Sequence, residues 1–154
     1  MFIFVAALTT SAWNITDKTS QLDGARSYHA LLQAEGTVAN IIDHSERPSL
    51  NVDCDKGGLY VDVDWPDFVQ KELGETRVTV GWKLDSGEVH RTNWMAGDQL
   101  VALKGREAVE MLRLFQSANK LVVQVPDHHG GQDAVFDLHG VADVASAVST
   151  MRCG

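Results

Sequence analysis

The sequence predicts an α+β fold that is mainly β: an antiparallel sheet or a β-sandwich of hairpins, with two helices in the C-terminal half. Three observations predict it. Apolar and polar residues alternate in several short stretches, which is the pattern of half-buried strands. Turn residues separate these stretches into pairs, as in hairpins. Two later stretches instead space their apolar residues three and four positions apart, which is typical of amphipathic helices.

The clearest hairpin covers residues 50–65. In residues 50–55 and again in 59–65, apolar side chains alternate with polar ones, most of them aspartates. Lys56-Gly57-Gly58 supplies the turn between the two arms. Pro66 ends the second arm, because proline cannot donate to a strand ladder.

Weaker forms of the same pattern predict further hairpins. We expect their arms at residues 78–84 and 89–95, at 121–125 and 134–138, and at 13–15 and 28–34. Residues 35–49 show the weakest pattern of the chain, and we expect them to form a loop rim.

Two segments have helical spacing. The first runs from Arg106 to Ala118, with glutamates near its start and an arginine later, which suits the helix dipole. The second follows Gly140 and delivers Cys153 at its end. Their apolar stripes consist of Ala108, Val109, Met111, Leu112 and Phe115, and of Val141, Val144, Ala145, Val148 and Met151.

Length and composition predict one globular domain over residues 13–154. The chain has 154 residues, of which 44% are apolar and 22% are charged, close to the averages of folded soluble domains. Residues 1–12 begin with an apolar run followed by small residues. This segment is either a signal peptide that lacks its basic start or an N-terminal pairing strand.

The charge excludes some partners. The formal net charge is −8, which disfavours nucleic acid and anionic membrane surfaces, since both need clustered lysine and arginine. No stretch reaches the roughly 18–20 continuous apolar residues that cross a bilayer. We expect no membrane span and no cofactor, and we expect a protein partner or an oligomer instead.

The two cysteines, Cys54 and Cys153, lack the close spacing of a zinc or thioredoxin site. They are either inert buried thiols or one long-range disulfide. The position of Cys153 near the end of the chain favours the disulfide, which would tie down a segment that otherwise frays. A disulfide would indicate an oxidising compartment or an extracellular particle.

No catalytic constellation stands out. The loop from Asp127 to Asp133 contains His128 and His129, but adjacent histidines on an extended segment point to opposite faces, so we interpret this loop as a hairpin turn and predict no metal site. We interpret the aspartates of the 50–65 hairpin as a solvated face. Within that hairpin, we expect Asp62, Asp64 and an exposed Trp65 to form a surface for a partner.

The ordered set of motifs resembles a known family. The pieces are Trp13-Asn14-Ile15-Thr16, residues 47–54 running into 59–65, Arg77-Val78-Thr79-Val80, residues 112–115, 120–125 and 134–138, and the final Cys153-Gly154. This order is similar to that of the VasI/TagO-type accessory proteins of type VI secretion and their relatives, some of which phages encode. The resemblance covers most of the chain from Trp13 onward. The His128-His129-Gly130-Gly131 loop departs from the family pattern.

The resemblance implies a small β domain that faces the cell envelope, with a disulfide between Cys54 and Cys153 and no enzymatic activity. Our first hypothesis is a noncatalytic accessory or binding protein, periplasmic or extracellular. The alternative is a structural subunit of a larger assembly, such as a phage virion, that pairs through its N-terminal segment.

Overall fold

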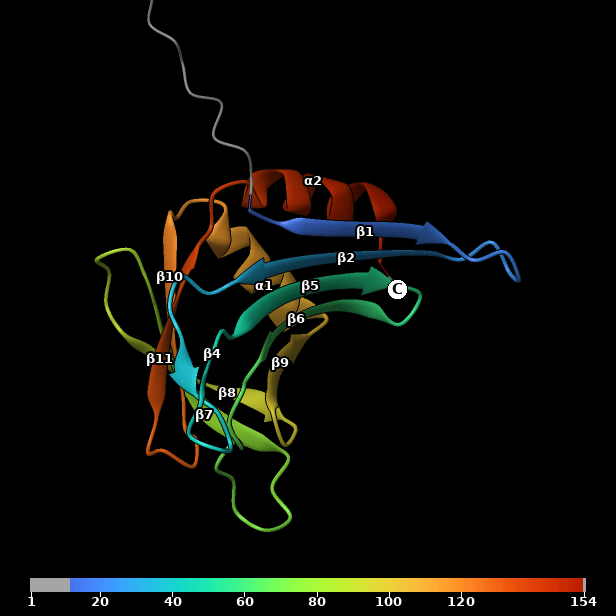
Figure 1. The fold of residues 1–154 in the computed structure, drawn as a ribbon. Coiled ribbons are helices and arrows are strands. Elements are labelled where there is room, and N and C mark those ends of the chain that lie inside the picture. Colours follow the sequence, from blue (N-terminus) through green and yellow to red (C-terminus); the bar gives the residue numbers. More distant parts are fainter. Residues whose placement is uncertain (1–11, 154) are drawn as a thin grey trace, which may run out of the picture.

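A computed structural model describes residues 12–153, which form one curved antiparallel sheet and two helices (Figure 1). The sheet has nine strands in the order β1-β2-β5-β6-β9-β8-β7-β10-β11. A short hairpin, β3-β4, stands apart from it. The strands are β1 (Asn14–Thr19), β2 (Arg26–Gln33), β3 (Val38–Ala39), β4 (Ser45–Glu46), β5 (Ser49–Asp55), β6 (Gly58–Asp64), β7 (Arg77–Leu84), β8 (His90–Ala96), β9 (Leu100–Lys104), β10 (Lys120–Val125) and β11 (Gln132–Asp137).

The four hairpins that the sequence predicts are confirmed as β1-β2, β5-β6, β7-β8 and β10-β11. In the β5-β6 hairpin, Leu50 pairs with Val63 and Val52 pairs with Val61, so these buried side chains share one face. The side chain of Asp55 accepts a hydrogen bond of 2.6 Å from the backbone of Gly57, which stabilises the turn. The observed pairing of β5 with β6 is therefore the one that the apolar–polar alternation and the glycine turn predict.

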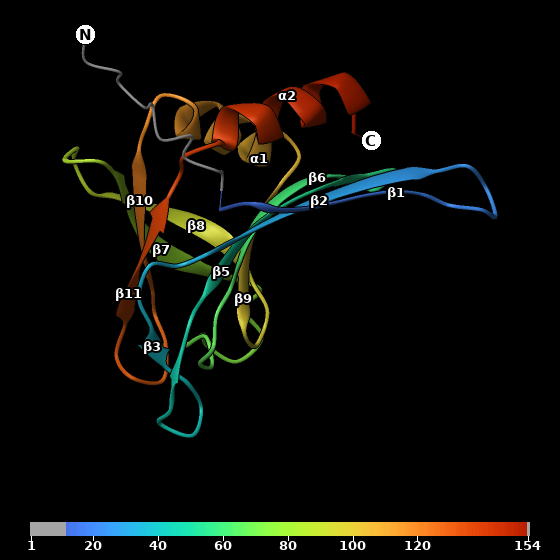
Figure 2. The ribbon, with the colours of Figure 1, turned by 45° about the horizontal axis from the view of Figure 1, so that its top comes forward.

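The two predicted helices are α1 (Arg106–Phe115) and α2 (Val141–Met151). The sheet bends around α1, which packs on β6 and β9, while α2 packs on β5 and against α1 (Figures 1 and 2). The buried side of α1 consists of Ala108, Met111, Leu112 and Phe115. Burying each large apolar side chain is worth roughly 1.5–3 kcal/mol, so this stripe holds α1 against the sheet.

The last strand of the sheet is linked back to the chain that follows β2. The backbone N–H of Glu35 donates to the carbonyl of Val135 on β11 at 2.8 Å. The side chain of Gln132 bonds the backbone of Ala39 on β3 in both directions, at 2.7 and 3.1 Å. The curved sheet therefore closes partly on itself.

The predicted disulfide is present. It joins Cys54 on β5, which is 1% exposed, to Cys153 just after α2, with the two Cα atoms 5.3 Å apart. The sequence separation is 99 residues. The bond fixes the end of α2 to the sheet, as the position of Cys153 led us to expect.

The structure adds elements that the pattern does not single out. β9 is one of them, because three of its five residues in succession are buried and no alternation is visible. Within the expected loop rim, β3 and β4 form a two-residue ladder. The two predictions for residues 1–12 fall almost entirely on residues 1–11, which lie outside the described residues. Between residues 12 and 153 no helix is long and apolar enough to cross a membrane.

Candidate functional site

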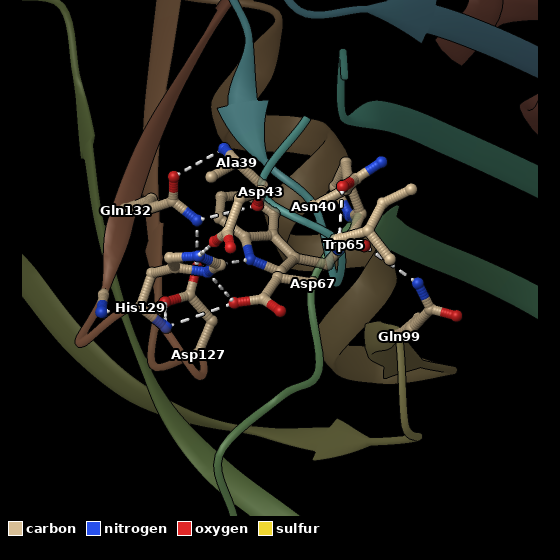
Figure 3. Close-up of polar contacts among 12 residues, drawn as sticks. Ala39, Asn40, Asp43, Trp65, Asp67, Gln99, Asp127, His129 and Gln132 are labelled. Carbon is tan, nitrogen blue, oxygen red and sulfur yellow. Dashed lines mark hydrogen bonds and ion pairs between the residues drawn. The ribbon is translucent and has the colours of Figure 1, made fainter. Parts of the chain in front are cut away.

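Three loops meet at one end of the sheet around a group that we call the loop clamp: Asp43, Asp67, Asp127 and His129 (Figure 3). Asp43 lies in the turn between β3 and β4, and Asp67 follows β6. Asp127 and His129 lie in the loop between β10 and β11. Residues that are far apart in the sequence are thus joined by hydrogen bonds.

Asp127 is the buried anchor of the clamp, with 3% of its surface exposed. Its Oδ2 accepts hydrogen bonds from Trp65 Nε1 and Gln132 Nε2, both at 2.9 Å. Its Oδ1 accepts the backbone N–H groups of His129 and Gly131, at 3.0 and 2.9 Å. Four donors therefore satisfy this buried carboxylate, which is the condition for burying a charge at low cost.

His129 lies between two carboxylates. Its Nδ1 is 2.6 Å from Asp67 Oδ2 and its Nε2 is 2.7 Å from Asp43 Oδ1. Hydrogen bonds to Asp43 and then to Asp67 raise the pKa of His129 to about 9. Burial alone would raise the pKa of Asp67, but the hydrogen bond from His129 and backbone hydrogen bonds leave that pKa lowered. At neutral pH the ring is an imidazolium that donates from both nitrogens.

The clamp contains the set of side chains best suited to a metal ion within the described residues. Donor atoms of Asp67, Asp127 and His129 all lie within 4.8 Å of one another. Asp67 is fully buried, and its Oδ1 has no hydrogen-bond partner. However, Asp127 already has four donors, and a cation at His129 would have to displace a proton. The geometry is therefore that of a hydrogen-bonded unit that holds loops in place.

Large exposed apolar side chains lie next to two clamp residues in the chain. Ile41 and Ile42, which precede Asp43, are 41% and 65% exposed, and Phe68, which follows Asp67, is 47% exposed. We call these three residues the apolar loop surface. The Asn40 side chain accepts the backbone N–H of Ile42 at 3.0 Å, and the Phe68 carbonyl accepts that of His128 at 3.0 Å. These side chains thus sit on loops that the clamp and its backbone contacts hold in one arrangement.

The expectation that Trp65 is exposed is wrong. Its side chain is 1% exposed, and its Nε1 donates to Asp127 (Figure 3). Trp65 directly follows the last residue of β6, just before the chain reaches Asp67 of the clamp, and its indole is buried in the core. It supports the candidate site from below and cannot contact a partner.

The expectation of a solvated acidic face on the β5-β6 hairpin holds only in part. Asp62 and Asp64 lie on the side of the hairpin opposite the buried Leu50 and Val52. Asp64 is exposed, but Asp62 is half-buried. Asn51, which lies between them on β5, is only 2% exposed, and its Nδ2 donates to Asp62 at 2.9 Å and to Asp64 at 3.0 Å.

The environment of Asp62 changes its acidity. Burial, together with the negative charges of Asp53 and Asp64, raises the pKa of Asp62 to about 7, although the hydrogen bond from Asn51 acts in the opposite direction. Asp53 itself pairs with His29 on β2. Asp62 therefore keeps its proton to a higher pH than an ordinary surface aspartate does.

The apolar loop surface was not found by sequence reasoning. Ile41 and Ile42 lie in the segment with the weakest pattern, and Phe68 follows a proline outside any alternating stretch. A usable signal was present, because two adjacent isoleucines between polar residues in a loop are unusual unless they are buried or bind something.

Comparison of this chain with known protein families, with curated proteins and with solved structures found no match.

Proposed function

We propose that this chain is a noncatalytic binding protein that recognises a protein partner through its apolar loop surface. The observation that carries the proposal is that Ile42 and Phe68 are exposed on two different loops. The ring of His129 joins these two loops through its hydrogen bonds to Asp43 and Asp67. Binding residues are commonly found on loops that a rigid scaffold positions, and exposed apolar side chains that gather in one place mark interaction sites. The acidic side chains of the clamp beside them favour a partner with a basic rim over an anionic membrane.

The chemistry of the clamp supports a noncatalytic role. A general base needs a nitrogen or oxygen that is free to take a proton near the working pH. Both ring nitrogens of His129 are occupied by carboxylates, and its raised pKa keeps it protonated at neutral pH. The four donors to Asp127 likewise leave that carboxylate no free lone pair.

The disulfide supports a place outside the reducing cytoplasm. Bonds such as Cys54–Cys153 persist in oxidising compartments. The similarity of the motif order to accessory proteins of type VI secretion supports the bacterial envelope, in the periplasm or outside the cell.

The test compares two variants that each remove exposed apolar side chains. One combines Ile42→Ser with Phe68→Ser. The control is Leu22→Ser in the β1-β2 turn, which lies away from the clamp loops (Figure 1); Leu22 is 96% exposed, more than Ile42 or Phe68. We expect immobilised wild type and control to retain the same protein from a periplasmic extract of the producing cells, and the double variant to lose it. Equal retention by all three proteins would refute the proposal.

A second candidate, a structural subunit of an assembly such as a phage particle, is favoured by the position of β1. This strand ends the sheet order, and no strand within residues 12–153 pairs with its outer side. A neighbouring chain could add a strand there. Size-exclusion chromatography of the chain with and without residues 1–12 tests this role. Oligomers that disappear on truncation would support it, and a monomer in both cases would exclude it.

A further inference from the structure

The two helices leave a cavity between them that the clamp does not use. It has a volume of about 420 Å³ and lies between α1, α2 and the start of β6. This volume falls within the range of about 300–1,000 Å³ that is typical of small-molecule sites, which are mostly apolar with a few polar groups. The apolar part of its lining includes Leu59, Val109, Leu112, Ala145 and Val148.

The apolar lining combines a buried floor with one exposed residue. Leu112 and Val148 are only 4% and 7% exposed. Val109 belongs to the apolar stripe that the sequence predicts for α1, yet it is 52% exposed. An apolar ligand in the cavity would remove Val109 from water, which is favourable.

The polar part of the lining carries positive charge and no negative charge. It consists of Arg113, Gln116, Ser149 and Arg152, although the formal net charge of the whole chain is −8. Arg113 pairs with Glu110 at 3.0 Å. The guanidinium of Arg152 forms no ion pair within residues 12–153. The lining therefore offers one unpaired cation beside an apolar cavity, which suits a ligand with an apolar body and a single anionic group.

The disulfide holds this arrangement in place. Cys153 is itself part of the lining, and its bond to Cys54 fixes the end of α2 to β5. Arg152, which precedes Cys153, is thereby held beside the cavity. A site that is ordered before its ligand arrives does not lose affinity to the cost of ordering.

We propose that the cavity between α1 and α2 binds a free fatty acid, with the alkyl chain on the apolar lining and the carboxylate at Arg152. The forked N–H groups of arginine match a carboxylate. The proposal goes beyond the proposed function and does not depend on it. The two helices lie away from the β3-β4 hairpin, whose turn carries Ile41 and Ile42 of the apolar loop surface (Figures 1 and 2).

The experiment is isothermal titration calorimetry of the full chain with sodium octanoate, decanoate and dodecanoate, each below its critical micelle concentration. Dodecyltrimethylammonium has the same chain length as dodecanoate and the opposite charge. Arg152→Gln is compared with Arg106→Gln, an exposed arginine outside the lining. Ser149→Trp, which fills the cavity, is compared with Ser146→Trp, an exposed serine of α2 outside the lining. Thermal unfolding checks that each variant folds.

We expect one saturable site per chain. Affinity should rise about fourfold for each methylene that is buried, so dodecanoate should bind up to about 200-fold more tightly than octanoate. An ion pair at an exposed arginine contributes up to about fivefold, so Arg152→Gln should bind dodecanoate about fivefold more weakly than Arg106→Gln. Ser149→Trp should lose binding, whereas Ser146→Trp should bind as wild type does.

Several results would overturn the proposal. They are the absence of saturable binding, equal affinity for octanoate and dodecanoate, and equal affinity for dodecanoate and dodecyltrimethylammonium. Equal binding by the two arginine variants or by the two tryptophan variants would do the same. A photoreactive phenylalanine derivative in place of Val109 tests other occupants of the cavity. One defined crosslink from this position to residues 1–11, to a second copy of the chain or to another protein would also overturn the proposal.

Discussion

The substitution Trp65→Phe distinguishes a buried support from an exposed contact residue. It keeps an aromatic ring in the core but removes the Nε1–H that donates to Asp127 at 2.9 Å. Hydrogen bonds to charged groups are worth about 1.5–3 kcal/mol, and the low end applies because Asp127 keeps three other donors. The cavity left by the lost pyrrole part adds about 1 kcal/mol. The free energy of unfolding should therefore fall by about 2.5 kcal/mol.

The assay is urea unfolding followed by far-ultraviolet circular dichroism, with the slope m expected to be unchanged. The matched control is Trp82→Phe, because Trp82 is also buried but donates to a neutral acceptor, the Thr92 hydroxyl, at 2.9 Å. Neutral hydrogen bonds are worth less, so the control should lose about 1 kcal/mol less than Trp65→Phe. A loss below about 0.5 kcal/mol for Trp65→Phe is typical of surface positions and would refute the buried anchor. A loss no larger than that of the control would refute the charged hydrogen bond.

Three further predictions concern the clamp and the disulfide. Folding raises the pKa of His129 from 6.5 to about 9, so the stability that His129 contributes should be complete below pH 6.5, decline as the pH rises and be lost above about pH 9. In His129→Gln, this decline should be absent from the pH profile of urea unfolding. A profile identical to that of wild type would contradict the pairing of His129 with Asp43 and Asp67. Reduction of Cys54–Cys153 should lower the free energy of unfolding by up to about 4–5 kcal/mol, given the 99-residue separation, and Cys153→Ser should match the reduced wild type in the same titration. Because hydrogen bonds close the clamp, EDTA should leave the unfolding temperature unchanged, and a fall would show that His129 holds a metal ion.

Local patterns predict the hairpins and helices because both are decided by neighbours in the chain. The alternation from Leu50 to Cys54 and the glycine turn after it need no distant information, and the same holds for the apolar stripe of α1. β9 was not predicted, since a strand whose consecutive residues are all buried shows no period. The order in which hairpins join into one sheet likewise depends on contacts between distant segments.

The candidate site depends on such distant contacts throughout. Trp65 lies next to a proline, which made exposure plausible, but its partner Asp127 lies 62 residues further along the chain. The sequence analysis interpreted the two adjacent histidines as part of a hairpin turn and missed that His129 would contact Asp43 and Asp67 on two other loops. Sequence pattern shows which residues are polar, whereas only the folded sheet shows which of them meet.

The contact between the apolar loop surface and a protein partner can be measured most directly by photocrosslinking in the producing cells. A photoreactive phenylalanine derivative replaces Ile42 in one protein and Leu22 in another, both of them exposed apolar positions. The account predicts one defined crosslinked product from position 42, none from position 22, and loss of the product when Phe68→Ser is added. Absence of a product at position 42, or the same products at both positions, would contradict it.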